Sequence, residues 1–166
     1  MTVQAVALQP GGIFTGHTDR EVSNTARQMK NELASFLDMT NVGDRRMEGR
    51  LALLEAAEEA SEEDWDGYNA APVDMRSLYH AEKLLRALPL VVPAPEVSIH
   101  PNGNIMLEWH MGRRMAFTVS VGYDGALVYA GIFGSNTIHG TEYFADELPE
   151  TIARNLGRVL SAIHEP

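Results

Sequence analysis

The sequence predicts an α+β fold: an antiparallel β-meander of four to five strands, packed on one face by helices as a two-layer sandwich and preceded by an N-terminal helical hairpin. Two observations support this prediction. From Glu96 to Phe144, short runs alternate apolar and polar residues and are separated by turn signals such as Tyr123-Asp124-Gly125, a pattern typical of strands joined by hairpins. On both sides of this stretch, apolar residues recur at three- and four-residue spacing, which is the period of an amphipathic helix.

Residues 1–17 contain glycines and a proline without a clear period and are predicted to form a flexible or loosely docked arm. Thr18 or Asp19 can cap the helix that follows, in which apolar residues keep a helical spacing to about Leu37. The segment 41–44 contains Gly and Asn and is expected to break this helix.

A second helix is predicted from about Arg45 to Ala60, and its charges oppose the helix macrodipole. Basic residues gather at its start and acidic residues at its end, which weakens the ends by roughly a few tenths of a kcal/mol per charge. A helix charged in this way is expected to need a partner. Two alternatives follow: the hairpin docks on another subunit or protein, or it packs on its own domain.

The connector from Ser61 to Ala71 carries Trp65 and Tyr68 among acidic residues. Because exposed aromatic surface is costly in water, both rings are predicted to plug one end of the domain, with a ligand-stacking site as the alternative. Asp74 then caps a helix that ends at Pro89.

Three predicted strands between Glu96 and Val121 each have one apolar and one polar face, which is typical of an antiparallel sheet covered on one side. The residues predicted to face the core are Val97, Ile99, Ile105, Leu107, Trp109, Met115, Phe117, Val119 and Val121.

The fourth predicted strand, Ala126 to Phe133, is apolar on both faces, so we expect it to lie centrally or under another element. A loop is predicted at 135–138, followed by a short edge strand from His139 to Phe144. A terminal helix is predicted to begin near Leu148-Pro149-Glu150 and, with the helix that Asp74 caps, to cover the sheet. The predicted units are an arm with a helical hairpin at 1–60 and an α+β sheet domain at 61–166.

The composition narrows the classes of function. The chain holds 23 acidic and 13 basic side chains, a net charge of −10, and residues 51–75 hold eight acidic and no basic ones. Binding to nucleic acid needs clustered Lys and Arg. The sequence has only one such cluster, the short patch of Arg45, Arg46 and Arg50, so no nucleic acid is expected as a partner.

The lack of cysteine excludes disulfides and thiolate metal sites. No apolar run is long enough to span a bilayer and the start does not resemble a signal peptide, so we expect a cytoplasmic protein without a membrane partner.

Several short motifs follow one another in a specific order: Trp65-Asp66-Gly67-Tyr68-Asn69-Ala70-Ala71-Pro72, Leu88-Pro89, Pro95-Glu96-Val97, Leu107-Glu108-Trp109, Tyr129-Ala130-Gly131-Ile132-Phe133-Gly134 and His139-Gly140-Thr141-Glu142. In these motifs the chain resembles a small bacterial family of uncharacterised proteins. The resemblance covers about residues 65–160 and implies no reaction, cofactor or catalytic residue.

The polar sheet face and the stretch after the fourth strand hold the best candidate site. Glu108 and His110 are two residues apart on one predicted strand, so their side chains share a face, and imidazole with carboxylate can bind a metal ion. His139 and Glu142 would join them from the neighbouring loop, with Tyr129 and Thr141 nearby. The candidate binding residues, with the two connector aromatics, are Trp65, Tyr68, Glu108, His110, Tyr129, His139 and Glu142.

No HExxH, Gly-rich phosphate loop or Gly-x-Ser-x-Gly motif is present in the sequence. We therefore expect a protein-interaction or scaffold module that is not an enzyme and holds no cofactor or metal. Its partner would be another protein or a second copy of the chain, contacted by the acidic hairpin with Trp65 and Tyr68. The alternative is a metal-assisted hydrolase or small-ligand enzyme that uses the polar sheet face and the His139 to Glu142 loop.

Overall fold

The computed structural model of the chain describes residue 24, residues 27–31 and residues 45–163, with side chains as far as Ser161. The predicted arm at 1–17 lies outside these residues. So does most of the predicted helix from Thr18 to Leu37, of which residue 24 and residues 27–31 are helical.

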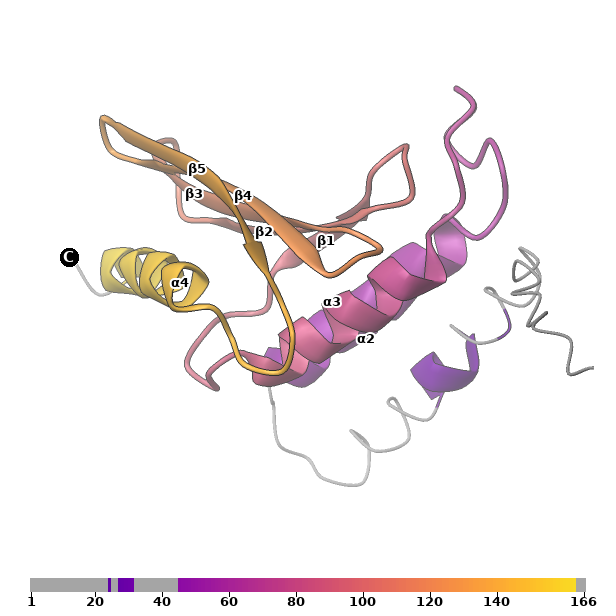
Figure 1. The fold of residues 1–166 in the computed structure, drawn as a ribbon, viewed down its shortest axis with the longest axis horizontal. Coiled ribbons are helices and arrows are strands. Elements are labelled where there is room, and N and C mark those ends of the chain that lie inside the picture. Colours follow the sequence, from indigo (N-terminus) through magenta and orange to yellow (C-terminus); the bar gives the residue numbers. More distant parts are fainter. Residues whose placement is uncertain (1–23, 25–26, 32–44, 164–166) are drawn as a thin grey trace, which may run out of the picture.

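The described part of the chain forms a five-stranded antiparallel sheet with helices packed on it (Figure 1), which confirms the predicted fold class. The strand order is β1-β2-β3-β4-β5, so each strand pairs with its neighbours in sequence. The strands are β1 (Glu96–Ile99), β2 (Ile105–His110), β3 (Met115–Val121), β4 (Ala126–Phe133) and β5 (Asn136–Tyr143). The helices are α2 (Arg45–Glu59), α3 (Met75–Ala87) and α4 (Glu150–Ile163).

The loop predicted at 135–138 is wrong, because β5 already begins at Asn136. Phe133 pairs with Asn136, so only Gly134 and Ser135 connect the two strands. Gly134 has a φ of +67°, a conformation that glycine adopts without strain and that suits two-residue hairpin turns. The edge strand predicted from His139 to Phe144 is therefore confirmed but begins three residues earlier, and the alternation missed this start because the side chains of β5 are exposed or half-buried on both faces.

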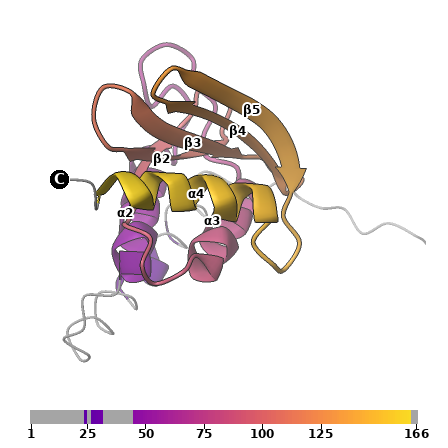
Figure 2. The ribbon, with the colours of Figure 1, turned by 90° about the vertical axis from the view of Figure 1, so that its left-hand side faces the viewer.

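The helices lie on one face of the sheet, and the other face is open in the described part of the chain (Figure 2). Side chains from β2, β3 and β4 on the covered face are buried, as the alternation predicted for the first three strands. α3 supplies Leu78, Leu84 and Leu85 to this core, and α4 supplies Ile152 and Leu156. β4 pairs on both sides, so of the two positions expected for it, inside the sheet or under another element, the first is confirmed.

α2 belongs to the same core. Its Leu53, Leu54 and Ala57 are fully buried and join the cluster that α3 and the sheet build. A Cβ added to Gly49 would lie 3.1 Å from Pro95 Cδ, so α2 passes close to the chain that leads into β1. Buried residues on both sides of position 60 therefore share one core, and the apolar face of α2 is already used within the chain.

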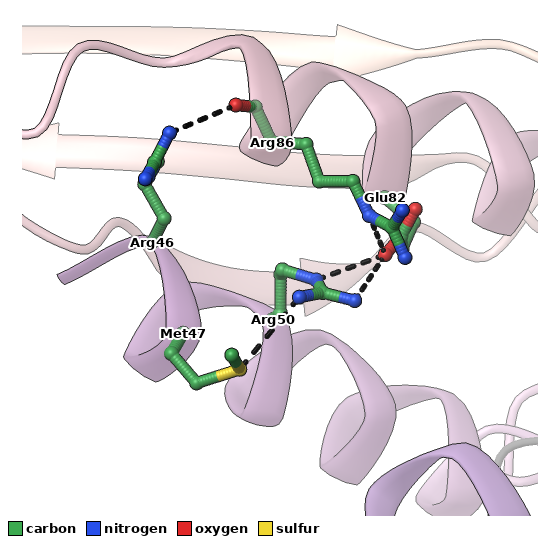
Figure 3. A network of polar contacts seen from close by, with 5 residues as sticks. All are labelled: Arg46, Met47, Arg50, Glu82 and Arg86. Carbon is green, nitrogen blue, oxygen red and sulfur yellow. Dashed lines mark hydrogen bonds and ion pairs between the residues drawn. The ribbon is translucent and has the colours of Figure 1, made fainter. Parts of the chain in front are cut away.

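The basic start of α2 lies beside the C-terminal end of α3 (Figure 3). Arg46 Nη1 donates to the main-chain oxygen of Arg86 at 3.4 Å, where the negative end of the α3 dipole favours a cation. Arg50 and Arg86 both donate to Glu82 Oε1, from Arg50 Nε at 2.8 Å and from Arg86 Nε at 2.6 Å. The charges that oppose the dipole of α2 are thus compensated by α3.

The acidic end of α2 is compensated as well, by the helical residues 27–31. Arg27 Nε lies 3.0 Å from Glu58 Oε1, and Lys30 Nζ lies 3.6 Å from Glu55 Oε1. The hydrogen bond from Arg27 lowers the pKa of the Glu58 carboxyl from its ordinary value. Of the two alternatives for the hairpin, packing on its own domain is confirmed for α2.

Candidate ligand-binding pocket

Glu108 and His139, two of the predicted site residues, lie in one row on the open face of the sheet but far apart. Glu108 pairs with Thr118, Thr118 with Ala130, and Ala130 with His139. Neighbouring strands are about 4.8 Å apart, so the two main chains are separated by roughly 14 Å. No single ion can bind both side chains, since metal bonds to protein ligands are about 2 Å long.

His110 and Glu142 do not complete a metal site either. His110 lies at the end of β2 in the row that leads to Thr137. Glu142 pairs with Leu127 and so belongs to the covered side of the sheet, opposite to His139. No group of three or more His, Asp or Glu side chains within the described ranges could hold a metal ion. The structure therefore does not bring Glu108, His110, His139 and Glu142 together.

The two connector aromatics differ from each other in burial. Trp65 is half-buried against the core, and its Nε1 donates to the main-chain oxygen of Ala71 at 3.0 Å. Tyr68 is 88% exposed, so its predicted role as a plug is wrong. The reason is local: the Tyr68 main-chain N–H donates to Asp66 Oδ1 at 2.8 Å, and Gly67 with a φ of +75° turns the chain outward at this point.

Tyr129 and His139, both predicted site residues, line one pocket together with α4. The pocket has a volume of about 430 Å³, which is within the range of roughly 300 to 1,000 Å³ typical of small-molecule sites. Its lining residues are Tyr129, Thr137, Ile138, His139, Thr151, Arg154, Asn155 and Arg158.

Tyr129 reaches this pocket because its partner on β5 has no side chain. Tyr129 pairs with Gly140, and a Cβ added to Gly140 would lie 2.7 Å from Tyr129 Cζ. The ring therefore lies over the Gly140 backbone, on the covered side of the sheet. In the part of the chain that the structure describes, its hydroxyl has no hydrogen-bond partner, so this hydroxyl is available to a bound molecule.

Arg158 is held at the pocket by two contacts. Its Cζ lies 3.7 Å from the centre of the Phe133 ring, and a cation over an aromatic face is attracted to it. Its Nη1 donates to Asn155 Oδ1 at 3.4 Å, while Asn155 Nδ2 donates to the Thr151 main-chain oxygen at 2.8 Å. Asn155 is buried at 5% exposure, so it fixes Arg158 from within the helix–sheet interface.

The pocket is locally positive in a chain of net charge −10. Among the described residues, the one carboxylate that approaches its two arginines is Glu150, whose Oε1 lies 4.0 Å from Arg154 Nη1. The Glu150 side chain is 94% exposed, so solvent screens this pair and it contributes little. Arg158 has no carboxylate within ion-pair distance in the described part of the chain.

The α4 residues of this pocket were not among the predicted site residues. One signal could have found them: Asn155 interrupts the apolar stripe of Ile152, Leu156 and Val159, and arginines stand three residues after it and one before it. A buried amide on an apolar helix face needs hydrogen-bond partners. That α4 and Tyr129 line the same pocket depends on the tertiary fold, and the spacing of residues in the sequence does not predict it.

Comparison with protein-family models, with curated proteins and with solved structures finds no match to this chain. The resemblance seen in the motifs between residues 65 and 160 stays a prediction. Within the described ranges, no helix has both the length and the apolar composition needed to cross a bilayer.

Proposed function

We propose that this protein is a non-enzymatic interaction module that associates with a second copy of itself along the free edge of β5. The observation that carries this proposal is a sheet edge eight residues long, Asn136–Tyr143, that no other described strand pairs with. Unpaired strand edges bind other strands because their main-chain donors and acceptors are unsatisfied.

The register identifies which main-chain groups are free. The Phe144 N–H donates to the Gly125 oxygen at 2.9 Å, so the pair Gly125 and Phe144 is of the hydrogen-bonded kind, and in an antiparallel ladder every second pair along the two strands is of the same kind. The even-numbered residues of β5 therefore bond to β4. The main-chain groups of Thr137, His139, Thr141 and Tyr143 point away from the sheet, and all four residues are exposed.

Edge strands are usually protected by lysine, proline or a bulge. β5 contains neither lysine nor proline, and its pairing with β4 is continuous over eight residues without a bulge. The opposite edge differs: β1 is four residues long, follows Pro93 and Pro95, and has α2 beside it. Among the described residues, β5 is thus the edge open to a partner.

A second copy fits this edge better than a different partner. An antiparallel pairing of β5 with itself is two-fold symmetric, so each free donor meets a free acceptor of the same strand. β5 contains one acidic side chain and one histidine, so two copies meet there with little repulsion although each chain has a net charge of −10. On the open face beside this edge, Val128 and Ile132 of β4 are 54% and 46% exposed and add apolar surface that a neighbouring sheet can cover.

Substitutions at Thr141 test the proposal. The Thr141 N–H points off the edge, so Thr141→Pro removes a donor needed by the partner strand and leaves the β4–β5 hydrogen bonds in place. Thr141→Ala keeps the N–H and is the matched control. By sedimentation equilibrium we expect the wild type and Thr141→Ala to have twice the 18.3 kDa mass of one chain, and Thr141→Pro to have the mass of one chain.

Thr141→Lys serves as a second variant, because a lysine on an edge disfavours strand pairing without restricting the backbone. A wild-type chain that stays at 18.3 kDa up to about millimolar concentration, where weak complexes form, would overturn the proposal. So would folded Pro and Lys variants that associate as the wild type does. A nucleic acid or a membrane is not proposed as a partner, because the net charge of −10 repels phosphate backbones and anionic lipids.

A further inference from the structure

We propose that the pocket between α4 and β5 binds a phosphate group, presented by a small phosphate monoester or as free phosphate. This inference goes beyond self-association, and its tests change Arg158 and Tyr129, which line the pocket but do not belong to the free edge of β5.

The first argument is the charge of the pocket. Two arginines at positions 154 and 158 stand one helical turn apart on α4 and line the same pocket. With Glu150 almost fully exposed and 4.0 Å from Arg154, the pair keeps a positive charge that protein carboxylates among the described residues do not neutralise. Because the chain as a whole is strongly acidic, this local excess of positive charge favours an anionic ligand.

The second argument is that Arg158 is held in position before a ligand arrives. Its guanidinium lies on the Phe133 ring at 3.7 Å and is bound by the buried Asn155. Only Nη1 is used in a hydrogen bond to a described residue, so the remaining N–H groups of the fork are available. A fixed guanidinium fork matches the geometry of two phosphate oxygens, and less ordering entropy is lost on binding.

The third argument is the number of neutral donors around the arginines. Tyr129 and Thr151 line the same pocket, and each carries a hydroxyl that can donate a hydrogen bond. A phosphate has three terminal oxygens that each accept hydrogen bonds, whereas a carboxylate has two, so this donor-rich set suits phosphate better. The volume of about 430 Å³ exceeds what a bare ion needs, and Ile138 with the Tyr129 ring gives an apolar wall, which favours a monoester with an organic group.

Calorimetric titration of the full-length chain with phenyl phosphate, inorganic phosphate and phenylacetate tests the inference. We expect saturable binding of both phosphates and at least about tenfold weaker binding of phenylacetate, because the carboxylate forms fewer charged hydrogen bonds. Tighter binding of phenyl phosphate than of inorganic phosphate identifies a monoester as the ligand class, and equal binding identifies free phosphate. No saturable binding of either phosphate would overturn the inference.

Variants separate the pocket from general charge. Arg158→Gln is expected to weaken phosphate binding by about tenfold or more, and Arg158→Lys to recover only part of it, since lysine lacks the fork. Arg45→Gln makes the same change of charge on α2, where Arg45 is exposed and donates to the Val91 oxygen at 3.4 Å, and is expected to change the affinity less than about twofold.

Tyr129→Phe removes one hydroxyl and keeps the ring, so it decides the question even if Arg158→Gln does not fold. We expect it to weaken phosphate binding by about threefold to tenfold. Each of three results would contradict the proposed site: equal weakening by Arg45→Gln and Arg158→Gln, a folded Arg158 variant that binds phosphate as the wild type does, or unchanged phosphate binding in Tyr129→Phe.

Discussion

Arg50 donates a hydrogen bond from Nε to Glu82 Oε1 at 2.8 Å, its Nη2 lies 2.6 Å from the same oxygen, and the two side chains are only 14% and 10% exposed. This ion pair connects α2 to α3 and is nearly buried. Removing one partner of such a pair leaves the other charge buried and uncompensated, which costs about 3 kcal/mol or more.

We therefore expect Glu82→Gln to lower the free energy of unfolding by about 3 kcal/mol. Arg86 also contacts Glu82, but its side chain is 60% exposed, so Arg86→Ala is expected to cost less than about 1 kcal/mol. Urea unfolding of both variants measures the difference. If Glu82→Gln were no less stable than Arg86→Ala, the Arg50–Glu82 pair would not be the link between the helices.

Two buried serines are expected to respond in opposite ways when each is replaced by alanine. The Ser77 hydroxyl on α3 is buried and has no hydrogen-bond partner among the described residues, so Ser77→Ala is expected to be neutral or to stabilise by up to about 1 kcal/mol. The Ser61 hydroxyl donates to the Glu58 main-chain oxygen at 2.8 Å, so Ser61→Ala is expected to destabilise by about 1 kcal/mol. Thermal unfolding of the two variants side by side checks the order, and a larger loss for Ser77→Ala would contradict it.

Two glycines offer a similar contrast. A Cβ at Gly140 would lie 2.7 Å from Tyr129 Cζ, so Gly140→Ala is expected to cost about 1 to 3 kcal/mol through overpacking. Gly157 lies within α4 with nothing within 4 Å of an added Cβ, so Gly157→Ala is expected to stabilise by about 0.5 to 1 kcal/mol.

A double-mutant cycle tests whether the expected loss of stability in Gly140→Ala comes from the clash with Tyr129. If the clash with Tyr129 is the cause, Gly140→Ala costs much less in a Tyr129→Ala background, and the double-mutant cycle gives a coupling energy of about 1 kcal/mol or more. Additive effects of the two substitutions would show that Tyr129 does not lie over Gly140.

Asp74 at the start of α3 links stability to pH. Burial raises the pKa of its carboxyl, but hydrogen bonds from the Arg76 side chain and from the main-chain N–H groups of Arg76 and Ser77 outweigh burial and hold the pKa below its ordinary value. A pKa that is lower in the folded than in the unfolded chain means that the carboxylate stabilises the fold above about pH 4. This contribution is lost as the pH falls through the folded-state pKa.

Asp74→Asn keeps a capping side chain and removes the charge. We expect the wild type to be more stable than Asp74→Asn by about 0.5 kcal/mol near pH 7, and the difference to shrink below about pH 4. Chemical unfolding of both proteins across this pH range measures the difference. A gap that stays constant or widens on acidification would contradict the assignment.

Much of the fold could be predicted because one face of each of the first three strands is buried. Ile105, Leu107 and Trp109 are buried on the covered side of the sheet. Because buried positions need apolar side chains, the strand has an alternating apolar pattern that can be read from the sequence. The start of β5 was missed because its exposed residues carry no such constraint. The outward position of Tyr68 was also missed, since it depends on a hydrogen bond to Asp66 and a positive φ at Gly67, which side-chain hydrophobicity does not report.

The candidate site was predicted only in part. Tyr129 and His139 were predicted as binding residues because they carry polar groups near the end of the meander, and both line one pocket. Arg154 and Arg158 look like the solvent-exposed positions of any amphipathic helix. Their role as pocket residues depends on the placement of α4 against β4 and on the support of Asn155 and Phe133, which arise only from the tertiary packing.

Hydrogen exchange of the β5 main-chain amides tests the proposed self-association most directly. The N–H groups of Ile138, Gly140 and Glu142 bond to β4 and should be protected at every protein concentration. Those of His139, Thr141 and Tyr143 point to the free edge and should be protected at high concentration and exchange rapidly on dilution. If these three amides exchange at unprotected rates even at the highest concentration, β5 is not the interface and the proposed function is wrong.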